Sequence, residues 1–329
     1  MNIKKPHSCS IVLLTKCLFK CKMCEMWKSN EEINAVSTDE WKSFISSLEN
    51  VLDGPRELVF SGGEPLLRKD IFELINFGSK RGFKTLMPSN GYLIDENVAK
   101  QIAESGLTEI FISLDSINPQ THDFLRGMPG AYERVMRAFD NLRKNCPDLR
   151  IGIIGVISGV NDKEIVELAK WVKSSVFLSG IYFQAIAKPF FVALTDSWYK
   201  EGNYGFLWPK DIPAIHRTID ELISLRNAGY PIHNFAMQLV IFKTYFARPD
   251  IRARKAACYA GDYVINVNPS GDISLCCFMK PVGNIKKDDI GKLWFSEQSA
   301  EMRQKMHNCT INCNNMVNCF FKEGEEEKS

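Results

Sequence analysis

Residues 9–24 read CSIVLLTKCLFKCKMC. The apolar run at residues 10–15 predicts a β-strand, and Cys17, Cys21 and Cys24 follow it directly. Three thiolates this close together in sequence point to a compact metal centre. A structural zinc site needs four protein ligands, whereas three cysteines on a four-iron cluster leave one iron open for an exogenous ligand. The stretch therefore predicts a strand that leads into a reactive metal site, with a small zinc site as the alternative.

The order of a strand and then a helix repeats along the first part of the chain. Strands are predicted at residues 10–15, 57–60, 83–87, 109–114, 150–157 and 180–185, and helices at 37–51, 70–81, 96–105, 131–145 and 162–173. Each helix returns the chain to the same end of the sheet, so that successive strands run parallel. Six strands are too few for a complete eight-fold barrel. The predicted fold class is α/β, with a partial (β/α)6 TIM-type barrel.

Two segments follow this barrel, which we assign to residues 1–190. Residues 191–257 are rich in aromatic side chains, contain one predicted helix at 212–228, and are expected to connect the domains, cover the barrel mouth and face substrate. Residues 258–329 are predicted to form a small cysteine-rich extension. It would contain a β-hairpin (263–267 with 272–276) and a helix at 293–306.

Composition restricts the class of protein. The 329 residues are 45% hydrophobic and 24% charged, with a formal net charge of +2. Such a chain can bury a core, and its charge gives no reason to expect a nucleic-acid or membrane partner. It contains no apolar run of membrane-spanning length, and residues 11–14 are too short for a signal-peptide core. We expect a cytoplasmic protein, in which the 11 cysteines serve metal or redox sites rather than disulfides.

A second motif follows the second predicted strand, where residues 61–65 read SGGEP. Two glycines would let the backbone approach a ligand closely. Together with C-x3-C-x2-C, this motif resembles the radical S-adenosylmethionine (SAM) superfamily over about residues 8–190. The resemblance implies that Cys17, Cys21 and Cys24 hold a [4Fe–4S] cluster whose fourth iron binds SAM. Reductive cleavage of SAM would then give a 5′-deoxyadenosyl radical that abstracts a hydrogen atom from substrate.

The resemblance also implies a set of SAM contacts. These are Met23, whose backbone would meet the adenine; Ser61, Gly62, Gly63 and Glu64, which would receive the amino group; Ser89 and Ser113, which would face SAM from strand ends; and Arg126, near the carboxylate. Several of these positions have a structural alternative. Ser89 and the two residues after it could form only a turn, and Arg126 could be a solvated helix residue.

A second set of cysteines lies in the extension: Cys258, Cys276, Cys309, Cys313 and Cys319. With Gly271 between the first two, their spacing resembles the SPASM domain of radical SAM enzymes, or its shortened twitch form. Because the later cysteines of the full pattern are missing, the resemblance implies one auxiliary [4Fe–4S] cluster. Its ligands would be Cys258, Cys276 and two of the other three, with a zinc site as the alternative. Cys277 would point the other way along a strand and serve as a hydrogen donor, a spare ligand or a buried thiol.

The resemblance implies a radical SAM oxidoreductase or modifying enzyme. The expected outcome is oxidation, epimerisation or cross-linking of a peptide or protein substrate. One alternative is dehydrogenation or epimerisation of a sugar or aminoglycoside-type small molecule, and another is a non-enzymatic metal-binding scaffold. An electron donor such as flavodoxin or ferredoxin is an expected partner.

Overall fold

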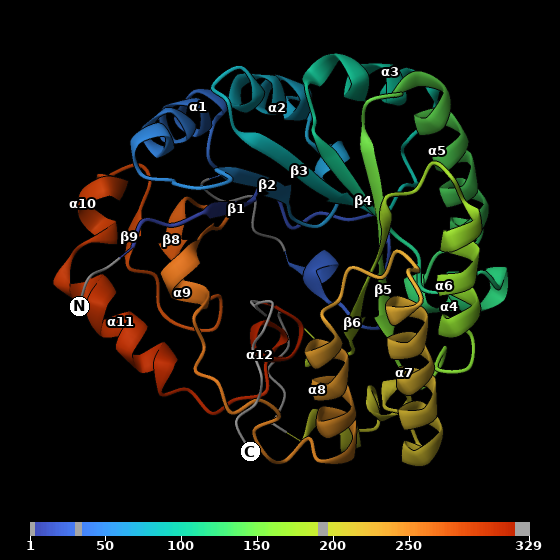
Figure 1. Cartoon of the computed structure of the whole chain (residues 1–329). Helices are drawn as coiled ribbons and strands as arrows, with labels where there is room; N and C mark the ends of the chain where they lie inside the picture. The colour runs from blue at the N-terminus through green and yellow to red at the C-terminus, as the bar shows by residue number, and fades with distance from the viewer. Residues whose placement is uncertain (1–3, 30–34, 190–196, 320–329) are drawn as a thin grey trace.

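The computed structural model describes residues 4–29, 35–189 and 197–319 and shows a curved sheet with helices on its outer face (Figure 1). The parallel strands are β1 (Ser8–Val12), β2 (Glu57–Ser61), β3 (Lys84–Ser89), β4 (Glu109–Ser113), β5 (Arg150–Ile157) and β6 (Gly180–Ala185). The helices between them are α1 (Thr38–Ser47), α2 (Ile71–Ser79), α3 (Glu96–Ser105), α4 (Pro119–Arg126), α5 (Ala131–Asn145) and α6 (Ile165–Ser174). The strands lie side by side in chain order, which confirms the predicted partial α/β barrel.

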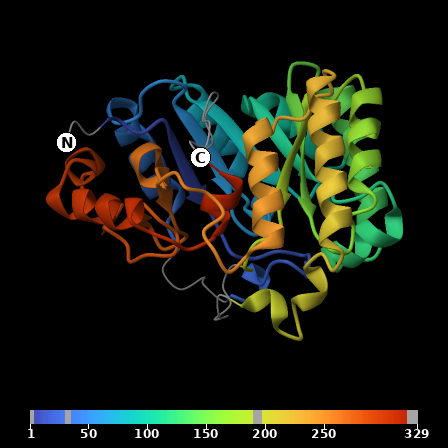
Figure 2. The same cartoon turned by 60° about the horizontal axis from the view of Figure 1, so that its bottom comes forward.

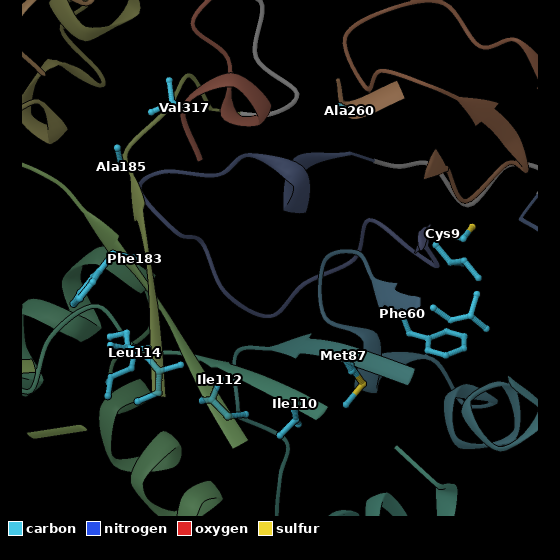
Figure 3. Packing of buried hydrophobic residues seen from close by; sticks show 14 of the residues in the cluster. Cys9, Phe60, Met87, Ile110, Ile112, Leu114, Phe183, Ala185, Ala260 and Val317 are labelled. Atoms are coloured by element: carbon cyan, nitrogen blue, oxygen red, sulfur yellow. The ribbon is translucent and has the colours of Figure 1, made fainter. Parts of the chain in front are cut away.

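The main core lies between the sheet and its outer helices. Cys9 and Ile11 of β1 are buried on the helix side, whereas Ser8 and Ser10 alternate with them and face the barrel interior. Figure 3 shows the same buried layer continuing through Phe60, Ile110 and Ile112 to Phe183. The side-chain period of two along each strand therefore separates an apolar outer face from the inner face that lines the barrel.

Local capping fixes where the helices begin and end. The Ser37 hydroxyl accepts a hydrogen bond from the Glu40 N–H, and the Glu40 carboxylate accepts one from the Ser37 N–H at 2.8 Å. Helix α3 ends at Gly106, whose φ of 78° is left-handed. Among the described residues, no helix combines the length and apolar character that crossing a membrane requires.

The extension joins the edge of the barrel sheet. Strand β7 (Val264–Val267) pairs parallel with β1 and antiparallel with β8 (Asp272–Ser274), and β9 (Gly283–Asn284) follows β8. The predicted hairpin is confirmed, although β8 ends before Cys276. The helix predicted at 293–306 is instead two helices, α10 (Ile290–Trp294) and α11 (Glu297–His307), because the Ser296 side chain caps a new helix. The short helices α9 (Ala260–Tyr263) and α12 (Asn314–Asn318) complete the described part of the extension.

The described part of the connector, residues 197–257, contains one α-helix more than the sequence predicted. Helix α7 (Ile212–Asn227) matches the prediction, but α8 (Ala236–Ala247) was missed. The buried residues of α8 lie on one face of the helix, but the polar Gln238 belongs to that face and the apolar Val240 lies on the exposed one, so its sequence shows no clear amphipathic period. Figure 2 shows the red helices α10 and α11 on the side of the barrel opening opposite the pair α7 and α8, whereas α12 lies beside α8.

Two buried amides cover the open edge of β6. The Asn234 side chain bonds both the N–H and the carbonyl of Phe183, at 2.7 and 2.8 Å. Asn318, at the end of α12, does the same for Ala185 at 2.8 and 2.9 Å. Each amide replaces the backbone partner that a further strand would have supplied, since buried peptide groups require partners. Asn318 thereby fixes the end of the extension on the barrel.

Replacing Asn318 by Ala should leave the N–H and carbonyl of Ala185 buried without partners. We expect the free energy of unfolding to fall by on the order of 2–4 kcal/mol, measured by urea denaturation. Asn203→Ala is the control because Asn203 is exposed. Equal stability of the two variants would show that the amide does not hold the β6 edge.

Candidate functional site

The three N-terminal cysteines lie on the loop that leaves β1, at the end where parallel barrels place their chemistry. The thiols of Cys17, Cys21 and Cys24 lie within electrostatic reach of one another. Burial raises the pKa of all three, and that of Cys21 to about 12. Cys9 is buried in the core on the other face of β1 and cannot join them. The structure thus brings three thiols together, which is the donor set that leaves one iron of a four-iron cluster open.

The cysteine loop is held by the end of α4 and by the loop after β3. The Lys22 N–H donates to the Leu125 carbonyl at 2.8 Å. A Cβ added to Gly127 would lie 2.1 Å from the Lys20 carbonyl oxygen, so only glycine allows this contact. The Asn90 amide lies 3.8 Å from the Cys17 sulfur. The loop therefore has fixed neighbours on both sides.

The two glycines after β2 approach the backbone of β1 rather than open space. A Cβ on Gly62 would lie 2.3 Å from the Leu14 oxygen, and one on Gly63 would lie 2.1 Å from the Lys16 oxygen. The Gly63 N–H also donates to the Leu14 carbonyl at 2.9 Å. In this structure the two glycines approach the chain that leads into Cys17. Their contact with SAM stays a prediction.

Glu64 joins the loop after β2 to the loop after β3. Its carboxylate is buried and accepts hydrogen bonds from the Ser89 hydroxyl at 2.9 Å and the Asn90 N–H at 2.8 Å. Burial raises the pKa of Glu64 to about 7. The Ser89 oxygen also accepts the Gly91 N–H at 3.0 Å. Both side chains therefore support the loops, and their predicted contacts with SAM remain predictions.

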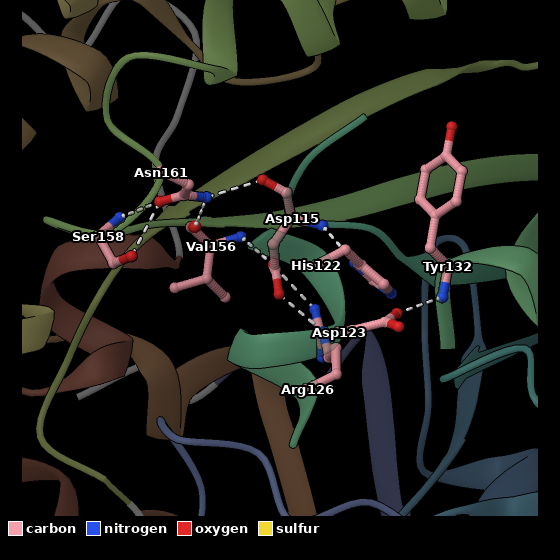
Figure 4. Close-up of polar contacts among 8 residues, drawn as sticks. All are labelled: Asp115, His122, Asp123, Arg126, Tyr132, Val156, Ser158 and Asn161. Atoms are coloured by element: carbon pink, nitrogen blue, oxygen red, sulfur yellow. Dashed lines mark hydrogen bonds and ion pairs between the residues drawn. The ribbon is translucent and has the colours of Figure 1, made fainter. Parts of the chain in front are cut away.

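Arg126 forms a buried ion pair with Asp115 (Figure 4). The guanidinium Nε and Nη2 atoms lie 2.7 and 2.9 Å from the two carboxylate oxygens, and Asp115 also accepts the Val156 N–H at 2.9 Å. The interpretation of Arg126 as a solvated helix residue is wrong, because the ion pair and the core enclose it. Its charge lies near the Cys21 thiol.

Two further residues of this network, Asn161 and His122, could not be identified as site residues from the sequence. The Asn161 amide donates to the Asp115 and Val156 carbonyls at 2.7 and 2.8 Å. His122 accepts the Asp115 N–H on Nδ1 at 3.3 Å. Burial, together with the charge of Arg126, lowers the pKa of His122 to about 4, so that the ring is neutral at pH 7. Neither residue belongs to a short motif, because their partners come from other parts of the chain.

The other predicted SAM contacts also lie near this end of the barrel. Met23 is half-buried between two of the cysteines and packs against the core. The Ser61 hydroxyl donates to the Ile11 carbonyl at 3.2 Å. Ser113 ends β4 and is partly exposed. The structure places all three at the ends of strands or in the cysteine loop, as the sequence predicts.

The cysteines of the extension divide between two cavities. Cys258, Cys276, Cys309 and Cys313 line a cavity of about 730 Å³. Cys319 instead lines a cavity of about 760 Å³ inside the barrel, together with Tyr182. Cys319 is still within electrostatic reach of Cys258 and Cys313. It therefore lies between the other four thiols and the barrel interior.

Cysteine thiolates are ligands of both zinc and four-iron clusters. The four thiols that line one cavity match the number of ligands that either of them requires.

The position of Cys277 differs from the prediction that it alternates with Cys276 along a strand. Because β8 ends at Ser274, Cys276 and Cys277 lie beyond it. Cys277 is exposed, so it is not a buried apolar thiol, and its sulfur lies within hydrogen-bonding reach of that of Cys276.

Comparison with known proteins assigns both parts of the chain to families. Residues 11–172 match the model of the radical SAM superfamily. Residues 258–319 match SPASM, an iron–sulfur cluster-binding domain. The first match contains most of the barrel, with the Cys17, Cys21 and Cys24 loop, and the second contains the six cysteines of the extension.

Curated relatives include two AdoMet-dependent heme synthases. That of Methanosarcina barkeri is 35% identical over 162 residues, which are 48% of this chain and only 45% of the relative. That of Nitratidesulfovibrio vulgaris is 36% identical over 303 residues, 88% of this chain and 78% of the relative. The chain therefore spans less than half of the first relative and about three quarters of the second.

A solved structure supports the fold. Native anSMEcpe with bound AdoMet and Cp18Cys peptide superposes with a TM-score of 0.69 at 20% identity, covering 95% of this chain and 88% of that one. At this identity the likeness bears on the fold alone. The two family matches, the second heme synthase and the cysteine geometry together show that the chain belongs to the radical SAM superfamily and carries a SPASM domain. It is therefore an enzyme whose cofactors are SAM and [4Fe–4S] clusters.

Proposed function

We propose that this enzyme cleaves SAM reductively at a [4Fe–4S] cluster held by Cys17, Cys21 and Cys24, and abstracts a hydrogen atom from its substrate. The observation that carries the proposal is the convergence of three thiols on one anchored loop at the end of β1. When bound, the cluster and SAM supply the 5′-deoxyadenosyl radical. The chain's own residues position these groups and exclude water.

The same end of the barrel supplies the proposed contacts with SAM. Uncharged groups lie next to the cysteine loop or at strand ends. They are the backbone groups of Met23, Gly62 and Gly63 and the hydroxyls of Ser61 and Ser113. Neutral donors and acceptors of this kind suit the ribose, the adenine and the amino group. For Glu64 and Ser89 to contact SAM, the hydrogen bond between these two side chains would have to rearrange.

Arg126 has a different proposed part in the site. Its guanidinium is already neutralised by Asp115, so that a contact with the SAM carboxylate would compete with a buried ion pair. In its present position the side chain orders the end of α4, on which the cysteine loop rests. We therefore propose that Arg126 positions the cluster loop.

The cavity inside the barrel is the proposed substrate chamber. Inward-facing residues of the strands line it, among them Val59, Phe111, Ile154, Tyr182 and Gln184. Charged groups at the first residues of the strands, Glu57, Glu109 and Arg150, also line it, so the chamber extends away from the cysteine loop and suits a substrate with both apolar and polar parts. Cys319 lines this chamber and is within electrostatic reach of Cys258 and Cys313, two of the ligands proposed for the auxiliary cluster. We therefore propose that the auxiliary cluster accepts an electron from the substrate radical.

For the substrate, two classes have support of different kinds. A peptide or protein substrate is supported by the peptide bound to anSMEcpe, which shares the fold. A tetrapyrrole is supported by the heme synthase that is 36% identical over 88% of this chain. Fold likeness alone identifies no substrate, so the tetrapyrrole has the stronger support. Mass analysis of products from each class, with reduced enzyme and SAM, would separate them.

We propose that Cys258, Cys276, Cys309 and Cys313 hold the single auxiliary [4Fe–4S] cluster. These four thiols share one cavity, whereas Cys319 lines the other. Cys258 is within electrostatic reach of Cys276 and Cys309, and Cys313 of Cys258 and Cys276. The choice among the three C-terminal cysteines thus rests on which cavity each one lines.

Replacing Cys17, Cys21 and Cys24 together by Ala should abolish conversion of SAM to 5′-deoxyadenosine under dithionite. The iron content of anaerobically reconstituted protein should fall from about eight to about four per chain, because only the auxiliary cluster remains. Cys146→Ala is the control, since that thiol is buried and bonds the Ala99 carbonyl. Undiminished SAM cleavage in the triple variant would refute the assignment.

The auxiliary ligands are tested by separate alanine variants. Cys309→Ala and Cys313→Ala should each lose about four irons and the matching part of the visible absorption. Cys319→Ala should keep about eight irons. The opposite result, with iron lost only from the Cys319 variant, would place Cys319 in the cluster.

A further inference from the structure

The outer face of the cysteine loop is basic. Residues 16–28 contain four lysines, Lys16, Lys20, Lys22 and Lys28, and a single acidic residue, Glu25. All four lysines are exposed. Glu25 is already bonded to Lys28 and to the Tyr204 hydroxyl. No carboxylate among the described residues pairs with the other three lysines, which leaves their charge available to a partner.

Aromatic rings lie between these lysines and extend the surface. Lys20 and Lys28 lie over the Trp27 ring, at 5.7 and 5.3 Å from its centre. Lys22 lies over Phe124 at 5.3 Å. Phe124 in turn contacts Phe206, and these two rings are 48% and 37% exposed. We call the six residues Lys20, Lys22, Trp27, Lys28, Phe124 and Phe206 the loop face.

Three separate segments build this surface. The loop contributes four of the residues, α4 contributes Phe124, and the connector contributes Phe206. Figure 2 shows the blue cysteine loop beside the yellow connector segment that contains residues 197–208. The Tyr204–Glu25 hydrogen bond, 2.5 Å long, joins the same two segments. The loop face is therefore a continuous part of the folded surface.

The loop face lies directly outside the three cysteines. Its lysines alternate with Cys17, Cys21 and Cys24 along the chain. The Trp27 indole donates a hydrogen bond to the Cys24 carbonyl at 3.0 Å, so that a ring on the surface is bonded to a residue of the metal site.

We propose that the loop face docks an acidic one-electron carrier protein, which supplies the electron for SAM cleavage. The proposal rests on the proposed function and names the partner of that site. In the transfer the carrier loses one electron, the N-terminal cluster gains it, and no bond forms or breaks. Opposite charge steers encounter and orients the carrier, while the exposed rings supply a small apolar contact typical of a transient complex.

The test uses two double variants that change net charge by the same amount. Lys20→Glu/Lys22→Glu reverses two charges of the loop face. Lys100→Glu/Lys170→Glu reverses two exposed charges on α3 and α6 and is the matched control. The rate of 5′-deoxyadenosine formation is measured for each full-length reconstituted enzyme, once with reduced flavodoxin at low ionic strength and once with dithionite.

With flavodoxin, the loop-face variant should react at least about tenfold more slowly than the wild type, and the control variant at the wild-type rate. With dithionite all three should agree within about twofold, since a small reductant needs no docking surface. Salt should slow the wild type with flavodoxin, because screening weakens the attraction.

Equal flavodoxin rates in the two double variants would overturn the docking assignment. A parallel loss with both reductants would also overturn it, because the lysines would then serve SAM or substrate. Failure of the wild type to cleave SAM with dithionite would instead reject the proposed function.

Discussion

The close approach of two backbone segments underlies the site. At Gly62 and Gly63, the chain leaving β2 lies so near the carbonyls of Leu14 and Lys16 that any side chain would collide with them. This contact sets the path of the chain from β1 into Cys17. The Glu64 carboxylate then ties the same loop to Ser89 and Asn90 after β3. Positions that come from three strands are thus fixed to one another before any cofactor binds.

The extension is built into the barrel rather than attached beside it. Strand β7 continues the sheet beyond β1, and Asn318 completes the opposite edge at β6. The cysteines of the extension are therefore held relative to the barrel from both edges. This explains how Cys319, which follows Asn318, lines the same interior cavity as Tyr182. The extension thus supplies hydrogen-bond partners to both edges of the barrel sheet.

Much of this arrangement could be predicted from the sequence, because parallel α/β units and clustered cysteines leave local patterns. Each of the six barrel strands was predicted, and so was the hairpin after Cys258. Helix α8 was not, since apolar residues lie on its exposed face as well as its buried one, and the break before α11 depends on a single cap at Ser296. The Asp115–Arg126 pair and the amides on β6 join residues distant in the chain, so no local spacing reveals them.

The central claim is that SAM binds directly to an iron that the protein leaves without a side-chain ligand. Electron paramagnetic resonance of the reduced enzyme, recorded before and after adding SAM, tests it most directly. The account predicts that the signal of the N-terminal cluster changes when SAM is added, while that of the auxiliary cluster does not. An unchanged spectrum at saturating SAM would contradict the account.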